Sequence, residues 1–229
     1  GAHQPAPQGS VVTAPDLPTI PYDLDDALLQ SARDDGQPRV RVYSPPELSV
    51  VIGRGGKQDL ELDRTAIAAD GVKLYKRPGG GCAVVLDAGN LIVSVALPLP
   101  GIGHIKSTFE AVGDWLIAGL EACGVPGVEQ RGGSDLAIGQ RKIGGSCVYR
   151  TRGLFYYSTT LLVDPDLELV ERYLPCPPRE PDYRAGRDHR AFMGSLKEME
   201  RVTDTDEFGT RLQAELDGRL GALAEATHI

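Results

Sequence analysis

The stretch Lys76-Arg77-Pro78-Gly79-Gly80-Gly81-Cys82-Ala83-Val84-Val85 places a cation, a proline and three glycines directly before an apolar run that favours a β-strand. Glycine lacks a Cβ and can adopt positive φ, so successive N–H groups of this loop can turn toward one ligand. Arg77 adds a forked donor suited to phosphate or carboxylate. A tight hairpin or a barrel corner would carry the same glycines, so the rest of the chain decides between these readings.

A second glycine-rich unit follows about fifty residues later, after Asp87-Ala88-Gly89-Asn90 has closed the first strand. It reads Gly132-Gly133-Ser134-Asp135-Leu136-Ala137-Ile138-Gly139-Gln140-Arg141-Lys142-Ile143-Gly144-Gly145-Ser146-Cys147. Two short strands, residues 135–138 and 142 onward, flank a Gly139-Gln140 turn. This pattern predicts Lys142 at the start of a strand, beside another flexible loop.

The two units together resemble the lipoate-protein ligase family, within the wider group that includes biotin-protein ligases and octanoyl transferases. The matching positions are Arg77, Gly79, Gly80, Gly81, Ala83, Val84, Asp87, Gly89 and Asn90 in the first unit, and Asp135, Leu136, Lys142, Ile143, Gly145 and Ser146 in the second. Residues 181–192 are similar to a Tyr-Arg-x-Gly-Arg-x-His-x-x-Phe stretch of some members. The resemblance therefore runs from about Ile52 to Leu196.

Several positions depart from the family pattern. Gly79 stands where Ser or Thr is usual, Gly144 where Ser is common, and Cys147 where Ala is common. Cys82 replaces a common Gly and Ser134 a common Asn, while a strand that often carries histidine reads Tyr156-Tyr157-Ser158-Thr159-Thr160-Leu161. Any hydrogen bond that the missing hydroxyls give a ligand must come from the backbone here.

Composition excludes some functions. The 229 residues carry a net charge of −8, which argues against nonspecific nucleic-acid binding, since that depends on many Lys and Arg contacts to phosphates. The four cysteines show no Cys-x-x-Cys spacing and no neighbouring histidines, so we expect no protein metal motif and a reduced, cytoplasmic protein. Neither a long apolar run nor a signal-peptide pattern is visible, and we expect no membrane partner.

The expected fold is α+β, with a mixed or antiparallel sheet packed against helices, as in the catalytic domain of biotin and lipoate-protein ligases. We expect a flexible N-terminal tail over residues 1–21 and a single catalytic domain over residues 22–229, with no separate accessory domain evident. Expected helices span residues 23–33, 60–70, 107–123, 166–173, 188–196 and 204–223. Expected strands span residues 39–43, 48–52, 72–75, 81–86, 91–96, 135–138, 142 onward and 154–163.

Some of these expectations concern packing. Residues 39–43 and 48–52 are expected to form an antiparallel pair, as are residues 81–86 and 91–96. The first helix is expected to bury Leu24, Ala27 and Leu28, and Trp115 is expected at the edge of the strongest helix as a core residue.

The resemblance implies that a lipoate or octanoate carboxylate attacks the α-phosphate of Mg²⁺-bound ATP, and that the acyl group then passes to a lysine of a lipoyl-acceptor domain protein. Both steps build negative charge on oxygen, so a fixed cation stabilises their transition states, and Lys142 is the expected catalytic residue. Ligand and ATP contacts are expected from Arg77, Gly79, Gly80, Gly81, Cys82, Ala83, Val84, Asp135, Gly145 and Ser146. Arg54, Asn90, Cys147 and Cys176 are further candidates.

Two other functions stay open at this point. One is an octanoyl transferase that takes the acyl group from a carrier protein through a cysteine thioester, with Cys147 or Cys176 as the nucleophile. The other is a noncatalytic module that binds acyl groups or nucleotides. Because many lipoate-protein ligases have an accessory domain after the catalytic region, a separate accessory subunit is a further possible partner.

Overall fold

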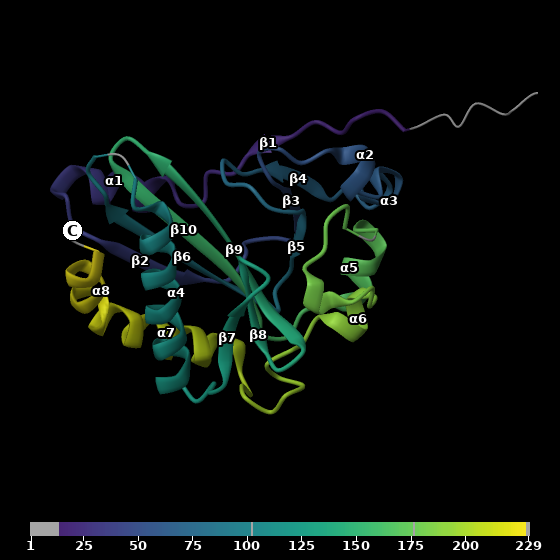
Figure 1. The fold of residues 1–229 in the computed structure, drawn as a ribbon. Coiled ribbons are helices and arrows are strands. Elements are labelled where there is room, and N and C mark those ends of the chain that lie inside the picture. The colour runs from purple at the N-terminus through teal and green to yellow at the C-terminus, as the bar shows by residue number, and fades with distance from the viewer. Residues whose placement is uncertain (1–13, 102, 176, 228–229) are drawn as a thin grey trace, which may run out of the picture.

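The computed structural model describes residues 14–101, 103–175 and 177–227, which form two β-sheets with helices around them (Figure 1). The large sheet has the strand order β2-β6-β10-β9-β8-β7. Its strands are β2 (Arg39–Tyr43), β6 (Asn90–Pro98), β7 (Val128–Arg131), β8 (Asp135–Ile138), β9 (Arg141–Thr151) and β10 (Leu154–Leu162). All of its neighbouring strands run antiparallel.

The small sheet has the order β1-β4-β3-β5, with both parallel and antiparallel pairs. Its strands are β1 (Ile20–Pro21), β3 (Ser49–Ile52), β4 (Lys73–Lys76) and β5 (Val84–Leu86). The helices are α1 (Asp26–Asp35), α2 (Gln58–Glu61), α3 (Arg64–Ala69), α4 (Ile105–Ala122), α5 (Leu167–Tyr173), α6 (His189–Phe192), α7 (Thr205–Gly218) and α8 (Leu220–Thr227), with a 3₁₀ turn at Asp182–Arg184. The predicted α+β class is confirmed.

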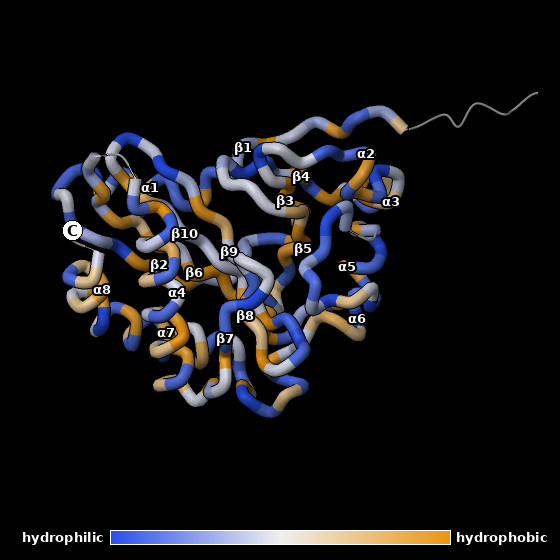
Figure 2. The backbone as a smooth tube through the Cα atoms, viewed as in Figure 1, coloured by the Kyte–Doolittle hydropathy of each residue, from blue (hydrophilic) through white to orange (hydrophobic). Residues whose placement is uncertain are grey.

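Alternation along the central strands gives the large sheet two different faces. Phe155, Tyr157 and Leu161 of β10 join the main hydrophobic core beneath α4, α7 and α8. The intervening Tyr156, Ser158 and Thr160 line a cavity on the opposite face, because successive side chains of a strand point to opposite sides. Figure 2 shows hydrophobic stretches on the strands in the middle of the molecule. The helical layer thus leaves the second face of the sheet free to form a site.

That second face is covered by α1 and by the small sheet. Leu29 and Ala32 of α1 pack against Ala96, Leu154 and Tyr156, while Val51 and Leu86 of the small sheet pack against Ile92. Of the predicted buried stripe, Leu28 is partly buried against this cluster, whereas Ala27 is exposed and Leu24 precedes the helix. The helix itself begins at Asp26 rather than at residue 23.

Other predictions were wrong as well. The helix expected over residues 188–196 ends at Phe192, and the one expected over residues 204–223 is divided into α7 and α8. Strands β2 and β3 do not pair, since β2 joins β6 in the large sheet and β3 joins β4 and β5 in the small one; β5 and β6 likewise lie in different sheets. The helix expected over residues 60–70 is two short helices, because the Asp63 side chain accepts a hydrogen bond from the Ala66 N–H and starts α3 anew.

Residues 14–21, which were assigned to the N-terminal tail, lie along the small sheet. Strand β1 pairs in parallel with β4, and the Leu17 backbone exchanges two hydrogen bonds with the Gln58 side chain. The tail expected over residues 1–21 is therefore too long, and residues 1–13 lie outside the described part of the chain. No helix within residues 14–101, 103–175 and 177–227 has the length and apolar character needed to span a bilayer.

Candidate active site

The site is a cavity of two connected chambers between the sheets. The inner chamber has Asp25, Tyr149 and Tyr156 at its far end, and its lining also includes Tyr22, Leu29, Ser158 and, level with Thr160, Leu86 and Ile92. The outer chamber runs beneath the proline-rich segment and α6, and its lining includes Asn90, Leu174, Pro177, Arg184, His189, Phe192 and Met193. Both chambers share the lining residues Gly81, Cys82, Ala83, Val84, Ser134, Asp135, Lys142, Gly145 and Thr160. The two predicted motifs therefore meet at the junction of the chambers.

Lys142 lies at this junction in a fixed arrangement. Its Nζ is 2.8 Å from Asp135 Oδ1, and the other carboxylate oxygen of Asp135 accepts a 2.9 Å hydrogen bond from the Tyr183 hydroxyl. Burial, and then the nearby Asp135 carboxylate, raises the pKa of Tyr183, so the phenol keeps its proton and donates. The ammonium group is thereby held by one carboxylate and stays accessible from the cavity.

Gly145 provides the space for this lysine. A Cβ at position 145 would lie 3.1 Å from Lys142 Nζ and 3.2 Å from its Cε, which is tighter than ordinary van der Waals contact. The Lys142 side chain therefore folds over the backbone of its own strand, β9, toward the Asp135 carboxylate. Gly145 therefore serves the site by leaving room for the Lys142 side chain.

Arg77 lines the inner chamber, and the donors of its guanidinium bond to backbone carbonyls. Its guanidinium donates hydrogen bonds to the backbone carbonyls of Val51, Gly80 and Cys82, with the shortest two at 2.8 and 2.9 Å. Arg54, expected as a wall of the site, contributes its backbone N–H to the Gly79 carbonyl, while its side chain lies in a separate surface hollow outside both chambers. Both arginines therefore hold carbonyls of the glycine loop, Arg77 from the wall of the inner chamber and Arg54 from outside it.

This arrangement decides where the loop's N–H groups point. In a planar trans peptide the C=O and the following N–H point in opposite directions. Since the carbonyls of Gly79 and Gly80 are held by Arg54 and Arg77, the N–H groups of Gly80 and Gly81 face the other way, and neither has a partner among the described residues. Gly81 lines both chambers, whereas Gly80 lines the separate surface hollow beside Arg54, so the structure places only the Gly81 residue of this pair at the site.

Glu61 is a loop-supporting residue that the sequence did not reveal. This buried carboxylate accepts hydrogen bonds from the N–H groups of Lys57 and, at 2.6 Å, of Ala83. Ala83 was expected to contact ligand, but its backbone donor is taken by Glu61. Glu61 lies in a short helix with a mostly polar sequence, so nothing in the local pattern marked it as buried.

Asn90 lies in the outer chamber as a buried amide. Its Oδ1 accepts a 2.8 Å hydrogen bond from the Asp87 N–H, which fixes the orientation of the amide, and its Nδ2 has no hydrogen-bond partner in the described structure. A buried donor without a partner is costly unless a ligand satisfies it. Asn90 is therefore a strong candidate for ligand contact.

Ser146 and Cys147 differ from expectation. The Ser146 hydroxyl turns to the helical face of the sheet and bonds the Tyr157 hydroxyl at 2.7 Å, so only the backbone of Ser146 faces the cavity. Cys147 does line the inner chamber, but burial raises the pKa of its thiol, which disfavours the thiolate that a nucleophile needs. Cys176 lies outside the described residues.

Two departures from the family pattern fit together in space. A Cβ on Gly79 would lie 3.1 Å from Cys147 Sγ and 3.2 Å from its Cβ. The thiol of Cys147 therefore occupies the room that a side chain at position 79 would need. Cysteine in place of the common alanine at 147 thus accompanies glycine in place of the usual serine or threonine at 79.

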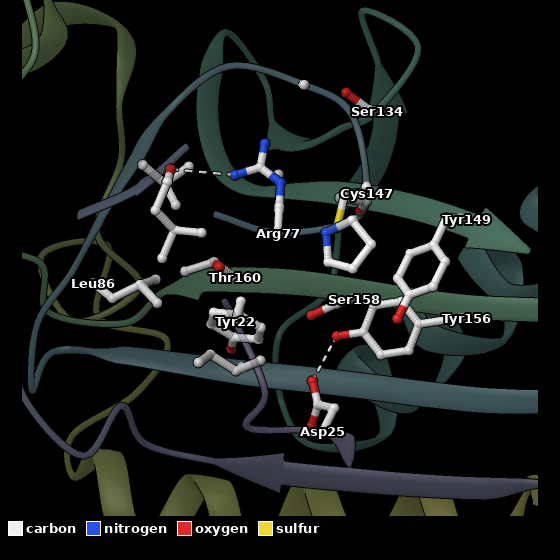
Figure 3. A pocket seen from close by; sticks show the side chains of 18 of the residues that line it. Tyr22, Asp25, Arg77, Leu86, Ser134, Cys147, Tyr149, Tyr156, Ser158 and Thr160 are labelled. Atoms are coloured by element: carbon white, nitrogen blue, oxygen red, sulfur yellow. Dashed lines mark hydrogen bonds between the residues drawn. The ribbon is translucent and has the colours of Figure 1, made fainter. Parts of the chain in front are cut away.

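Sequence reasoning missed the far end of the inner chamber. Figure 3 shows Asp25, Tyr22, Tyr156 and Ser158 around this end, with the Tyr156 hydroxyl bonded to the Asp25 carboxylate. Asp25 is only 3% exposed, although it stands among acidic residues that suggested the solvated first turn of a helix. Contacts between residues 131 positions apart could not be read from local patterns.

Comparison with known proteins identifies the family. The model of the lipoyl protein ligase A/B catalytic domain matches residues 18–217. The chain belongs to this family. Its curated relatives include a probable lipoate-protein ligase A of Mycoplasma genitalium, 28% identical over 168 residues that make up 73% of this chain and 49% of that protein. The present chain thus spans about half the length of the curated relatives it matches.

Solved structures support the same fold for this lipoyl protein ligase family member. A lipoate-protein ligase A bound with ATP has a TM-score of 0.70 and 20% identity, covering 90% of this chain and 91% of the other. A putative lipoate protein ligase from Thermoplasma acidophilum with bound lipoic acid has a TM-score of 0.67 and 22% identity, covering 88% of this chain and 86% of the other. These likenesses confirm the expected ligase-like fold.

Proposed function

We propose that this chain activates lipoate or octanoate with ATP to an acyl-AMP and passes the acyl group to a lysine of a lipoyl-acceptor domain protein. The observation that carries the proposal is Lys142, an ammonium fixed by Asp135 where two chambers meet. One chamber suits a medium-length chain and the other has room for a nucleotide. Lipoate and ATP are also the ligands named for the two solved structures of similar fold.

In this proposal the acyl chain occupies the inner chamber and the nucleotide the outer one. The unpartnered Asn90 Nδ2 donates to a ring nitrogen of the base, and the N–H group of Gly81 donates to an oxygen of the reacting phosphate or carboxylate. A carboxylate oxygen attacks the α-phosphorus, and pyrophosphate leaves with the electron pair of the broken P–O bond. Lys142 stabilises the charge that builds on oxygen in this step.

In the second step, the oxygen that bridges the acyl carbon and the α-phosphorus leaves with AMP. The acceptor amine attacks the acyl carbon, the C–O bond to the phosphate breaks, and AMP leaves with that oxygen while the amine loses a proton. A separate accessory subunit, Mg²⁺ on the nucleotide phosphates and a cytoplasmic location belong to the same proposal. Magnesium is usually held by substrate phosphates with few protein ligands.

The proposal is tested by release of pyrophosphate from ATP that depends on octanoate or lipoate. Lys142→Ala should lower turnover about a hundredfold or more, because losing one charge-stabilising donor typically costs about 2.7 to 4 kcal/mol. Lys142→Arg should rescue poorly, since a planar fork replaces a compact ammonium. Lys197→Ala is the matched control, because Lys197 also pairs with an aspartate at 2.8 Å, outside both chambers. Normal release by the Lys142→Ala protein would refute the assigned role.

The cysteine transferase is the outcome to distinguish. Among the described thiols, Cys123 is buried in the main core and Cys147 packs against the glycine loop. Single replacements of Cys82, Cys147 and Cys176 by Ser should leave acid-dependent turnover within about tenfold, or about 1.4 kcal/mol of barrier. Absence of pyrophosphate release, together with acyl transfer from an octanoyl-carrier protein that one Cys→Ser replacement abolishes, would establish the transferase instead.

A further inference from the structure

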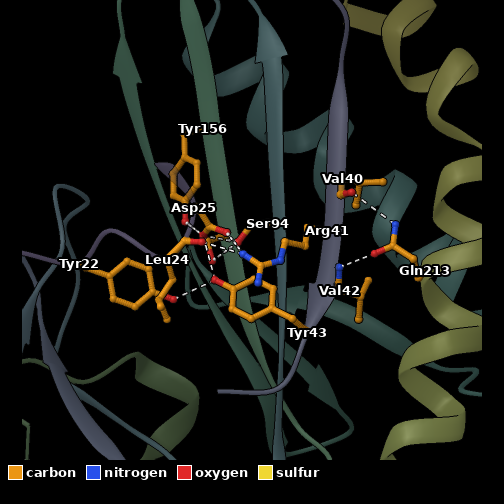
Figure 4. A network of polar contacts seen from close by, with 11 residues as sticks. Tyr22, Leu24, Asp25, Val40, Arg41, Val42, Tyr43, Ser94, Tyr156 and Gln213 are labelled. Carbon is orange, nitrogen blue, oxygen red and sulfur yellow. Dashed lines mark hydrogen bonds and ion pairs between the residues drawn. The ribbon is translucent and has the colours of Figure 1, made fainter. Parts of the chain in front are cut away.

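The far end of the inner chamber is built around a buried carboxylate. Asp25 Oδ2 accepts hydrogen bonds from three hydroxyls, Ser94 at 2.6 Å, Tyr156 at 2.5 Å and Tyr43 at 3.0 Å (Figure 4). Arg41 Nη1 lies 3.8 Å from the other oxygen, Oδ1, and balances the charge from outside the cavity. Because an ionised carboxylate can only accept hydrogen bonds, each of the three hydroxyls donates its single proton to Asp25.

These three bonds determine which hydroxyls donate in the next hydrogen bonds of the network. Tyr22 lies 3.0 Å from the Tyr43 hydroxyl, and Ser158 lies 3.2 Å from the Ser94 hydroxyl. Since Tyr43 and Ser94 have no proton left, Tyr22 and Ser158 must be the donors in these bonds. Burial raises the pKa of Tyr22, Tyr43 and Tyr156, so all three phenols keep their protons at neutral pH.

Three of these hydroxyls line the inner chamber: Tyr22, Tyr156 and Ser158, here called the acceptor floor. Each of their protons points toward Asp25 through the network, and only oxygen lone pairs are left to face the cavity. Tyr149 lines the same end outside the network and has no hydrogen-bond partner among the described residues, so its hydroxyl can turn either way. A purely hydrocarbon chain end would cover these acceptors without satisfying them.

The floor lies at the right distance from Lys142 to meet the end of a chain. The inner chamber is continuous from Lys142 to Asp25. Lys142 Nζ lies over Gly145, which pairs with Thr160 of β10. Ser158 and Tyr156 are two and four residues from Thr160 on that strand, which at about 3.4 Å per residue is roughly 7 and 14 Å. A span of this size suits a medium-chain acid whose carboxylate reaches Lys142.

We propose that the acceptor floor selects medium-chain carboxylic acids that carry an O–H or S–H donor near the far end, such as a hydroxy acid or the dithiol form of lipoate. This inference rests on the proposed function, in which the inner chamber holds the acyl group. Asp25 is the specificity-determining residue, because its carboxylate sets the direction of every hydroxyl in the floor. A donor on the ligand completes the floor, whereas an end without a donor leaves it unsatisfied.

The test compares direct binding of three acids of similar size, measured by calorimetry on the full chain: 8-hydroxyoctanoate, 8-fluorooctanoate and octanoate. The wild-type protein should bind the hydroxy acid at least about threefold tighter than the fluoro acid, the scale of one net hydrogen bond. The fluoro acid is polar but cannot donate, so it separates donation from polarity. Equal or weaker binding of the hydroxy acid would overturn the proposal.

Variants locate the effect. Asp25→Asn keeps the shape but supplies an amide donor, which lets floor hydroxyls turn their protons to the cavity, so the preference for the hydroxy acid should disappear. Ser158→Ala removes one acceptor and should reduce the preference. It serves as the second test if the Asp25→Asn protein folds poorly. Tyr75→Phe is the control, since that hydroxyl bonds Glu47 outside the cavity and its loss should leave the preference intact. An unchanged preference in both floor variants would contradict the proposal.

Pyrophosphate release in the presence of octanoate separates this inference from the function beneath it. If octanoate supports release but the hydroxy acid gains nothing, the floor is not a donor-selective site and the ligase function stands. If none of the acids binds or supports release, both the inner-chamber assignment and the inference fall.

Discussion

At the scale of single residues, the site depends on Asp135 as much as on Lys142. Asp135 accepts hydrogen bonds from both the Lys142 ammonium and the Tyr183 hydroxyl. The Arg131 guanidinium lies over the Tyr183 ring, with its Cζ 4.5 Å from the ring centroid. The carboxylate is therefore fixed from two sides. Tyr183 contacts no reacting atom in the proposed chemistry, so its role is to position the Asp135–Lys142 pair.

Tyr183→Phe tests this role. Removing a hydrogen bond to a carboxylate should loosen Asp135 and lower kcat about tenfold, the scale of a charged hydrogen bond, with a smaller change in KM for ATP and for the acid. Steady-state kinetics on both substrates measure the split. Tyr173→Phe is the control, because the Tyr173 hydroxyl donates a 2.7 Å hydrogen bond to Asp70 and lines neither chamber. An unaltered kcat would show that Tyr183 only packs.

Gly79 and Cys147 should show coupled effects on stability. Gly79→Ser places new atoms within 3.1 Å of the Cys147 thiol and should destabilise the fold by about 1 to 3 kcal/mol, as overpacking does. Cys147→Ala in the same chain should recover part of that loss, because it removes the contact with Sγ and leaves the 3.2 Å contact with the Cβ of residue 147. Urea unfolding of the two single variants and the double variant measures the coupling. Additive free energies of unfolding would contradict the account.

Much of this residue-scale site was visible in the sequence. Lys142 and Asp135 come together because a short turn pairs their strands, which local sequence predicts well. Arg77, by contrast, was assigned to the ligand because its chemistry suits phosphate; its actual partners are carbonyls of its own loop. Residue type indicates which side chains can donate, whereas the direction in which they donate depends on the fold.

At the scale of elements, helices and strands were predicted far better than their pairing. Strand β8 has the predicted bounds, and α4 differs from prediction by two residues or fewer at each end. The wrong pairs, β2 with β3 and β5 with β6, both came from assuming that strands adjacent in sequence pair in space. Here the chain crosses from one sheet to the other at each of these connections, and that crossing forms the cavity between the sheets.

Helix α6 should make stability depend on pH. His189 begins this helix and its Nε2 lies 3.1 Å from the Leu174 carbonyl. Burial, and then Arg184, lowers the pKa of His189 below its ordinary value of 6.5. The unfolded chain therefore binds a proton that the folded chain does not, so the free energy of unfolding should fall as the pH drops below about 6.5.

His189→Gln should flatten this dependence, because glutamine keeps a donor for the Leu174 carbonyl and does not titrate. Urea unfolding between pH 5 and 8 measures it. His104→Gln is the control, since His104 lies on the surface at the start of α4. An equal acid sensitivity in the His189→Gln protein would mean that other groups carry the effect.

At the scale of the whole molecule, the large sheet separates stability from function. One face is sealed by α4, α7 and α8, and the other carries the two chambers with Lys142 between them (Figure 1). The family could be predicted because its two motifs are short runs of sequence, and the structure brings both to the chamber junction. The acceptor floor could not, because Asp25 reaches it from an apparently solvated acidic turn and its partners lie on three other strands.

The central claim is that a carboxylate oxygen attacks the α-phosphate of ATP beside Lys142. It is tested most directly with octanoate labelled with ¹⁸O in both carboxylate positions, ATP, and hydroxylamine as the acceptor amine. The account predicts AMP that carries one labelled oxygen, because the bridging oxygen of the acyl-AMP leaves with the phosphate. Unlabelled AMP, or acyl transfer without any AMP, would contradict it.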